Sequence, residues 1–306
     1  MSTSSDANKR IAKNTLLLYV RQILVMAVSL YTVRIVLEAL GEVDYGIYNV
    51  VGGFVSMFNI ISGSVTVAIS RYLTIEIGRN NLKRAREIFS TSIIVLLAIA
   101  VLLWLVAETA GVWFVDTKMV MPPERLFSAI WVLRFSLLAF VINLLSVPYN
   151  AVIIAHEKMS VFARISILEV MLKLLVAYAL CMSPTDKLML YACLTTLVAL
   201  IVRMVYGIYC KRHFEESHFA FVFDKSLLRS MTSFTGWSFV GGGIAVLKDQ
   251  GCNLLLNLFG GPVVNAARGI AMQVNTGVFS FVSNFMMASN PLITKNLCTR
   301  KCRGDA

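Results

Sequence analysis

Charged residues are scarce in this sequence, and hydrophobic residues are abundant. Asp, Glu, Lys and Arg together make up 15% of its 306 residues, whereas hydrophobic residues make up 58%. A water-soluble domain of this length needs far more charge to cover its surface, so the composition excludes the soluble globular class. Because lipid offers the backbone no hydrogen-bond partners, runs of about 20 apolar residues predict membrane-spanning helices.

The sequence also lacks the motifs of an enzyme. It contains three histidines and no GxSxG, HExxH, phosphate-loop or acidic metal motif. Such motifs supply the nucleophile, the general base or the metal ligands of many hydrolases and phosphotransferases. We therefore expect no enzyme, no catalytic residue, no metal site and no cofactor. The six cysteines lie mostly in apolar stretches, which is not typical of a disulfide framework.

Eight stretches are long and apolar enough to cross a bilayer. They cover residues 14–37, 45–70, 88–114, 127–155, 161–181, 188–209, 231–258 and 263–292. The first follows a basic segment, but it has full spanning length and no small-residue cleavage site, so we expect it to be retained. The predicted fold is all-α and polytopic, with about eight transmembrane helices.

Lys and Arg are distributed unevenly between the two sides of these spans. With the N-terminus in the cytoplasm, 18 of the 28 basic residues fall in cytoplasmic segments, seven in the spans, and only Lys118, Arg125 and Lys187 in external loops. This asymmetry predicts a cytoplasmic N-terminus. It also accounts for the net charge of +11 without a nucleic-acid partner.

A weak internal repeat relates the first two spans to the last two at an offset of 220 residues. Five pairs keep one register: Gly41–Gly261, Val43–Val263, Ser56–Thr276, Ala68–Ala288 and Thr74–Thr294. Duplicated helical halves are a recurring transporter plan, whereas a general similarity of apolar helices is the alternative. The repeat predicts a six-helix lobe over 1–229, the first two helices of a second lobe over 230–297, and an unstructured tail over 298–306.

Ten charged residues lie inside the expected spans: Arg21, Arg34, Arg134, Lys173, Arg203, Lys248, Arg268, Glu108, Glu169 and Asp249. Each costs about 2.5–3.5 kcal/mol near the bilayer centre, so such groups face protein or water. Arg21, Arg34 and Arg203 lie near span ends, from which they can also reach the head groups. Glu169 and Lys173 are spaced i, i+4 and can pair. The excess of cations indicates an anionic substrate, and helix packing through paired charges is the alternative.

Small and polar side chains follow one face of residues 49–70 and recur in the last span. Asn49 and Asn59 belong to the first set, and Asn265 and Asn275 to the second. They either line a polar cavity or let helices pack closely. Three successive glycines at 241–243 predict a hinge in the seventh span.

Four strings resemble bacterial polysaccharide-export proteins: LGEVDYGIYNVVGG (40–53), VPYNAVIIAHEKM (147–159), FGGPVVNAARGIAMQVN (259–275) and NPLITKN (290–296). These proteins are the lipid-linked oligosaccharide (O-antigen, Wzx-type) flippases of the MATE-like superfamily, and the similarity runs over about 8–296. The resemblance implies two six-helix lobes around a cationic cavity that opens alternately to either side of the bacterial inner membrane. The implied cargo is an undecaprenyl-pyrophosphate-linked oligosaccharide for lipopolysaccharide or other polysaccharide biosynthesis, moved at the expense of an H⁺ or Na⁺ gradient.

With this resemblance, the residue types acquire expected roles. The pyrophosphate is expected to meet Arg21, Arg34, Lys173, Lys248 and Arg268. The polar lining is expected from Asn49, Asn59, Asn265 and Asn275, and coupling protonation from Glu169 or Asp249. Expected partners are the lipid-linked oligosaccharide, membrane lipid and other proteins of envelope polysaccharide assembly.

Two alternatives and one departure accompany this assignment. A MATE-type small-molecule exporter shares the architecture, although a net-positive set of buried charges disfavours organic cations. A membrane enzyme of envelope assembly usually carries long external loops, and none here exceeds about a dozen residues. The family has more spans than the eight expected here, so we expect a C-terminally truncated product.

Overall fold

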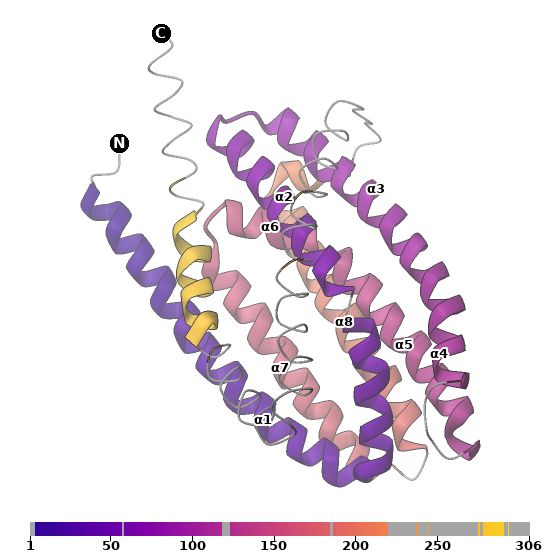
Figure 1. Cartoon of the computed structure of the whole chain (residues 1–306). Helices are drawn as coiled ribbons and strands as arrows, with labels where there is room; N and C mark the ends of the chain where they lie inside the picture. The colour runs from indigo at the N-terminus through magenta and orange to yellow at the C-terminus, as the bar shows by residue number, and fades with distance from the viewer. Residues whose placement is uncertain are drawn as a thin grey trace.

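The computed structural model describes residues 4–56, 58–117, 123–183, 186–219 and 278–290, together with the single residues 237, 244, 275 and 293. In this part of the chain every regular element is a helix (Figure 1). The all-α class predicted from the apolar runs is confirmed. Five helical stretches are long and apolar enough to cross a membrane: Ala12–Gly41, Leu82–Thr117, Pro123–Ala155, Met159–Met182 and Lys187–His213.

The total of about eight spans remains a prediction. The expected seventh span (231–258), including its glycine hinge, and most of the eighth (263–292) lie outside the described residues, apart from isolated positions and the helix at 278–290. The boundaries expected at 229/230 and 297/298 lie outside them as well, so the division into lobes also remains a prediction.

α1 (Ser4–Ser56) consists of two helical arms joined at Gly41. Gly41 has φ 76° and ψ 170°, a backbone conformation that glycine adopts without the steric penalty of a Cβ. The chain turns back on itself there, and the second arm rises beside the rest of the bundle (Figure 1). The sequence predicted a loop between the spans 14–37 and 45–70. That prediction is wrong, because the single residue Gly41 makes the reversal.

The expected span 45–70 is interrupted in the structure. The second arm of α1 ends at Ser56, and α2 (Asn59–Gly78) continues well past the expected end of the span. A tight turn with Asn80 at φ 60° leads into α3 (Leu82–Val106). The side chain of Asn81 caps α3 by accepting a hydrogen bond from the backbone N–H of Arg84 at 3.1 Å.

The next two expected spans are also subdivided. α3 passes through a π-helical turn (Ala107–Gly111) into α4 (Val112–Thr117). After a short 3-10 turn (Pro123–Arg125), α5 (Leu126–Leu144) is followed by α6 (Val147–Ala155). The break falls immediately before Pro148, which lies in the first turn of α6, where its missing N–H leaves no helical bond unmade.

The last two helices of the described bundle match their predictions closely. α7 (Met159–Met182) covers the expected 161–181, and α8 (Lys187–His213) covers 188–209. Asp186 caps α8 by accepting from the backbone N–H of Leu188 at 3.2 Å. A 3-10 turn (Glu215–Ser217) follows α8.

Helix pairing determines which side chains can meet. α1 packs mainly on α7, α5 on α8, and α2 on α6, around a core that contains fully buried Phe89, Leu133 and Ile153. The helix at 278–290 lies beside the first arm of α1 (Figure 1). α1, α7 and the helix at 278–290 therefore meet along one seam.

Candidate functional site

Arg21 lies where three segments of the chain meet. Its Nη1 donates to Ser166 Oγ on α7 at 3.3 Å, and its Nη2 donates to Asn284 Oδ1 in the helix at 278–290 at 3.1 Å. Nη2 also donates to Gln22 Oε1 at 3.1 Å, and the guanidinium stacks 5.1 Å from the ring centre of Phe162. Arg21 is thus half-buried, with its guanidinium bonded to side chains of α1, α7 and the helix at 278–290.

The surroundings of Arg21 are packed. Leu18, Met159 and Ala288 form a small buried cluster that joins α1, α7 and the helix at 278–290. Tyr19 packs edge-to-face on Phe281, with ring centres 5.3 Å apart. These contacts hold the guanidinium in one position, and its Nε is buried without an acceptor among the described residues.

A polar seam continues from Arg21 along α1 and α7. Ser166, Glu169 and Lys173 follow one another at steps of three and four on α7, so they share one face of that helix. Further along, the hydroxyl groups of Tyr31 on α1 and Tyr178 on α7 lie 3.0 Å apart. We call these residues with Arg21 the α1–α7 seam: Arg21, Tyr31, Ser166, Glu169, Lys173 and Tyr178.

The seam carries a net positive charge. Lys173 Nζ donates to Glu169 Oε1 at 2.6 Å, so the pairing predicted from their i, i+4 spacing is present. Both side chains are partly exposed, at 48% and 35%. Tyr206 of α8 lies close enough to Arg21, Ser166 and Glu169 to interact with all three. Two cations against one carboxylate, with several hydroxyl groups, can bind a phosphate and hydrogen-bond sugar hydroxyls.

The other expected site residues do not join this seam. Arg34 is exposed and pairs with Glu38 within α1 at 3.0 Å. Asn49 and Asn275 are exposed, and the side chain of Asn59 lies outside what the structure describes. Lys248, Asp249, Asn265 and Arg268 lie outside the described residues altogether. Of the five expected cations, the structure therefore brings Arg21 and Lys173 to one helix pair.

Glu108 and Arg134 form a further pair of charges. Both were recognised in the sequence as charges inside the expected spans, but neither was assigned a role at the site. Arg134 of α5 donates to Glu108 Oε1 through Nε at 3.0 Å, across the gap between α5 and the π-helical turn. The Arg134 guanidinium also lies 5.4 Å from the ring centre of Trp131. Their separation along the chain gave no reason to pair them, because only the packing of α3, α4 and α5 brings them together.

Arg203 is likewise held within the bundle. Its guanidinium carbon lies 3.9 Å from the ring centre of Tyr149, so α8 and α6 are joined by a cation–π contact. Because this contact lies between two helices of the bundle, Arg203 serves packing in the described structure.

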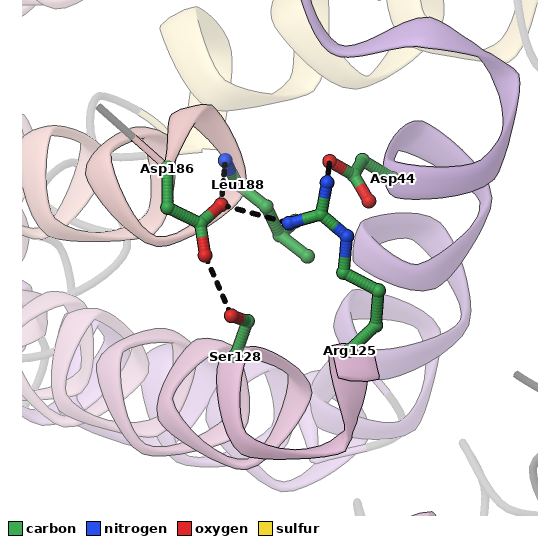
Figure 2. A network of polar contacts seen from close by, with 5 residues as sticks. All are labelled: Asp44, Arg125, Ser128, Asp186 and Leu188. Carbon is green, nitrogen blue, oxygen red and sulfur yellow. Dashed lines mark hydrogen bonds and ion pairs between the residues drawn. The ribbon is translucent and has the colours of Figure 1, made fainter. Parts of the chain in front are cut away.

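At the end of the bundle near Gly41, a polar network joins three elements (Figure 2). Arg125 Nη2 lies 3.0 Å from Asp44 Oδ2, and Arg125 Nη1 lies 3.2 Å from Asp186 Oδ1. Ser128 Oγ donates to Asp186 Oδ2 at 2.6 Å. Burial raises the pKa of the Asp44 carboxyl, the Arg125 charge opposes this, and the neighbouring Asp186 adds to it. The network ties the hairpin of α1 to the first turns of α5 and α8.

The opposite end of the bundle has its own polar contact. His156, after α6, hydrogen-bonds the buried carboxylate of Glu216, and its ring stacks on Phe214 with centres 4.3 Å apart. Arg86 Nε donates to the backbone carbonyl of His218 at 2.8 Å. Burial alone would raise the pKa of Glu216, but the His156 bond, a backbone N–H and the His156 charge together lower it. The chain leaving α8 is therefore fastened to α6 and α3.

The chain is similar to a family model described as "Polysaccharide biosynthesis protein", which matches residues 11–297. No curated protein matches the chain. Among solved structures it is similar to a MOP superfamily transporter from Pyrococcus furiosus Vc1, at 13% identity and a TM-score of 0.79, covering 98% of this chain and 68% of that one.

Two further solved structures show the same relation. One is a MATE protein in complex with MaD3S (14% identity, TM-score 0.77, 95% of this chain and 67% of that one). The other is an outward-facing multidrug resistance MATE family transporter of the MOP superfamily (15% identity, TM-score 0.75, 98% of this chain and 68% of that one). The chain thus spans about two-thirds of the length of these structures, and shares the fold of multi-pass MATE and MOP membrane transporters.

Proposed function

This chain belongs to the polysaccharide biosynthesis protein family, and from that premise we propose that it works as a flippase for a lipid-linked oligosaccharide. The cargo is an undecaprenyl-pyrophosphate-linked sugar unit, moved across the bacterial inner membrane from the cytoplasmic to the periplasmic side. The Gly41 end of the bundle then faces the periplasm, in keeping with the few basic residues in the segments expected there.

The physical task explains why a polar seam is needed. A sugar–pyrophosphate head group carries many hydrogen-bonding groups, and each one left unpaired in hydrocarbon costs several kcal/mol. A seam with fixed donors replaces water around the head group, while the prenyl chain remains in lipid. Arg21 carries this proposal, because it is a cation held by side chains of α1, α7 and the helix at 278–290.

Arg21 suits a phosphate better than a lysine would. A guanidinium presents several donors in a fixed plane, so it can hold two phosphate oxygens at once. Its present partners are neutral oxygens of Ser166, Gln22 and Asn284, which a doubly charged pyrophosphate can displace. Lys173 supplies a second cation, on the face of α7 that also carries Ser166. Arg34, Lys248 and Arg268 are the further cations of the proposal.

Ion coupling is part of the proposal. An H⁺ or Na⁺ gradient provides the free energy for net movement, and Glu169 in the seam and Asp249 are its proposed acceptors. Glu169 is paired with Lys173 and lies close to Tyr206, so a change of its charge reaches the residues around Arg21.

Transport into proteoliposomes tests the proposal. A fluorescent undecaprenyl-pyrophosphate-linked sugar is added outside, and its protection from an impermeant quencher is followed with time. We expect Arg21→Ala to slow protection about ten- to a hundred-fold, since a hydrogen bond to a charged group contributes about 1.5–3 kcal/mol. Arg79→Ala is the matched control, because Arg79 is an exposed arginine at the end of α2 whose ion pair among the described residues is with Glu76 of that helix. Equal rates for Arg21→Ala and the unaltered chain would refute the assignment.

A MATE-type exporter of small molecules is the second candidate, favoured by the fold shared with MATE transporters. The excess of positive charge in the α1–α7 seam disfavours an organic cation as cargo. Efflux of such cations from the same vesicles, unaffected by lipid-linked sugar, would reverse the order of the two candidates.

A further inference from the structure

The Glu108–Arg134 ion pair lies well inside two of the membrane-spanning stretches. Glu108 belongs to Leu82–Thr117 and Arg134 to Pro123–Ala155. Nine residues separate Glu108 from Thr117, which corresponds to a rise of roughly 13 Å along a helix, against a hydrocarbon core about 30 Å thick. The two side chains are 33% and 38% exposed. Because a charged pair does not face lipid, this exposed side is directed at water or at other protein.

The pair is asymmetric at the carboxylate. Nε and Nη2 of Arg134 both donate to Oε1 of Glu108, whereas a guanidinium usually spreads two donors over both oxygens. Oε2 is buried and accepts no hydrogen bond from the described residues. A carboxylate oxygen that no donor stabilises is the atom at which a proton is most readily accepted.

The backbone under Glu108 is a π-helical turn, a local departure from the α-helix that often occurs at functional sites. The hydroxyl of Thr109 bonds the carbonyl oxygens of Leu105 and Val106 at 3.0 and 3.1 Å, which supports the turn. On the inner side, Gly111 packs so closely that an added Cβ would lie 3.0 Å from the Phe54 ring and 3.1 Å from Leu133. The turn therefore couples the position of Glu108 to the packing of the second arm of α1.

Glu108 differs from the other deep acid in what it holds together. Among the described residues, Glu108 and Glu169 are the acids more than five residues from both ends of a spanning stretch. Glu169 pairs with Lys173 of its own helix, so protonation of Glu169 would break an ion pair within α7. Glu108 pairs with Arg134 of another helix, so its protonation removes a contact between two helices.

We infer that Glu108 is a proton-binding residue through which a proton gradient changes the packing of α3 and α4 against α5. A hydronium ion on the exposed side of the pair gives its proton to the Glu108 carboxylate and leaves as water, so an O–H bond forms and the carboxylate becomes neutral. Rotation of the carboxyl group then carries the proton to the Oε2 position, which no donor among the described residues occupies. Arg134 keeps its charge and its contact with Trp131 but loses its ion pair. Return of the proton to water restores the pair. This inference rests on the proposed ion-coupled transport for its role, but proton binding itself needs no cargo.

Tryptophan fluorescence tests proton binding without any substrate. The chain is reconstituted in vesicles and titrated with acid, and the emission of Trp131 is obtained as the difference from a Trp131→Phe variant. We expect a titration of the Trp131 signal in the unaltered chain and in Asp116→Asn, an exposed acid at the end of the same arm. Glu108→Gln, which keeps an acceptor for Arg134, should abolish it. An unchanged titration in Glu108→Gln, or its loss in Glu169→Gln instead, would overturn the inference, as would the absence of any titration in the unaltered chain.

Should Glu108→Gln fail to fold, Glu108→Asp answers the same question. The shorter acid still titrates but reaches Arg134 less well, so the midpoint must shift; an unshifted midpoint counts against Glu108. Transport then separates the two proposals. Glu108→Gln should retain exchange without a gradient and lose acceleration by an imposed pH gradient. Failure of the unaltered chain to move lipid-linked sugar, with a Glu108-dependent titration intact, would defeat the proposed function alone.

Discussion

Replacement of Arg125 by methionine should destabilise the bundle through the charge it leaves behind. The Asp44 side chain is 9% exposed and Arg125 is 38% exposed. Removing one partner of a fully buried ion pair costs about 3–5 kcal/mol, whereas an exposed pair contributes at most about 1 kcal/mol. Because solvent screens part of the guanidinium, we expect a loss of about 2 kcal/mol. For a cooperative unit of about 200 residues this lowers the Tm by about 4–8 °C.

A second substitution identifies the cause. Asp44→Asn in the Arg125→Met background removes the unpaired charge, so the double variant should be more stable than Arg125→Met alone. Asp186 keeps its bonds to Ser128 and to the Leu188 backbone, so it should contribute little to the loss of stability in Arg125→Met. Arg34→Met, at a pair whose two side chains are 77% and 65% exposed, is the control and should change the Tm by less than the scatter between preparations.

The pH dependence has a definite sign. Burial raises the folded-state pKa of Asp44 above its unfolded value, and Arg125 is the group that opposes this shift. An acid with a raised folded pKa destabilises the fold when it is charged, and this effect disappears as the pH falls through the folded pKa. The deficit of Arg125→Met should therefore shrink on acidification, as measured by thermal unfolding in detergent at several pH values. Additive effects of the two substitutions, or a deficit independent of pH, would refute the reasoning.

Three further outcomes follow from single residues. Glu216→Gln should lower the free energy of unfolding by about 1–3 kcal/mol at neutral pH, because it weakens the His156 bond. Because the folded-state pKa of Glu216 is lowered, this difference from the unaltered chain should vanish as the pH falls through that pKa, as measured by thermal unfolding. Gly41→Ala should cost about 1–2 kcal/mol, since a Cβ is strained at φ 76°, whereas Gly46→Ala in the following helix should be neutral or stabilising. Gly111→Ala should lower the Tm, because its Cβ would press on Phe54 and Leu133, and normal stability would contradict the packing of the π-helical turn.

Local patterns predicted the helices well and their joints poorly. Apolar runs at 161–181 and 188–209 correspond to α7 (Met159–Met182) and α8 (Lys187–His213) with small differences at their ends, because spanning length and hydropathy are properties of a contiguous segment. The same averaging joined residues on both sides of Ser56, whereas Pro148 marks the break between α5 and α6 in the sequence itself, because proline cannot donate a helical hydrogen bond. The reversal at Gly41 depends on one φ value, which hydropathy does not encode.

In the candidate site, contacts within one helix were predictable from the sequence, whereas contacts between helices were not. The Glu169–Lys173 pair was predictable because four residues along a helix bring two side chains together. The contacts of Arg21 with Asn284 and of Glu108 with Arg134 were not, because they depend on which helices are neighbours. Arg21 was selected for its charge, and its partners could be identified only from the packing of α1 against α7 and the helix at 278–290.

The proposed function requires that the head group of the cargo passes along the α1–α7 seam. A photoreactive amino acid placed at Tyr178, in the seam, and at Leu102, exposed on α3, tests this most directly by crosslinking to a radiolabelled lipid-linked sugar pyrophosphate in vesicles. We expect a crosslink at position 178 that excess unlabelled cargo suppresses and that weakens with Arg21→Ala, and no suppressible crosslink at 102. Equal, non-competable labelling at both positions would contradict the account.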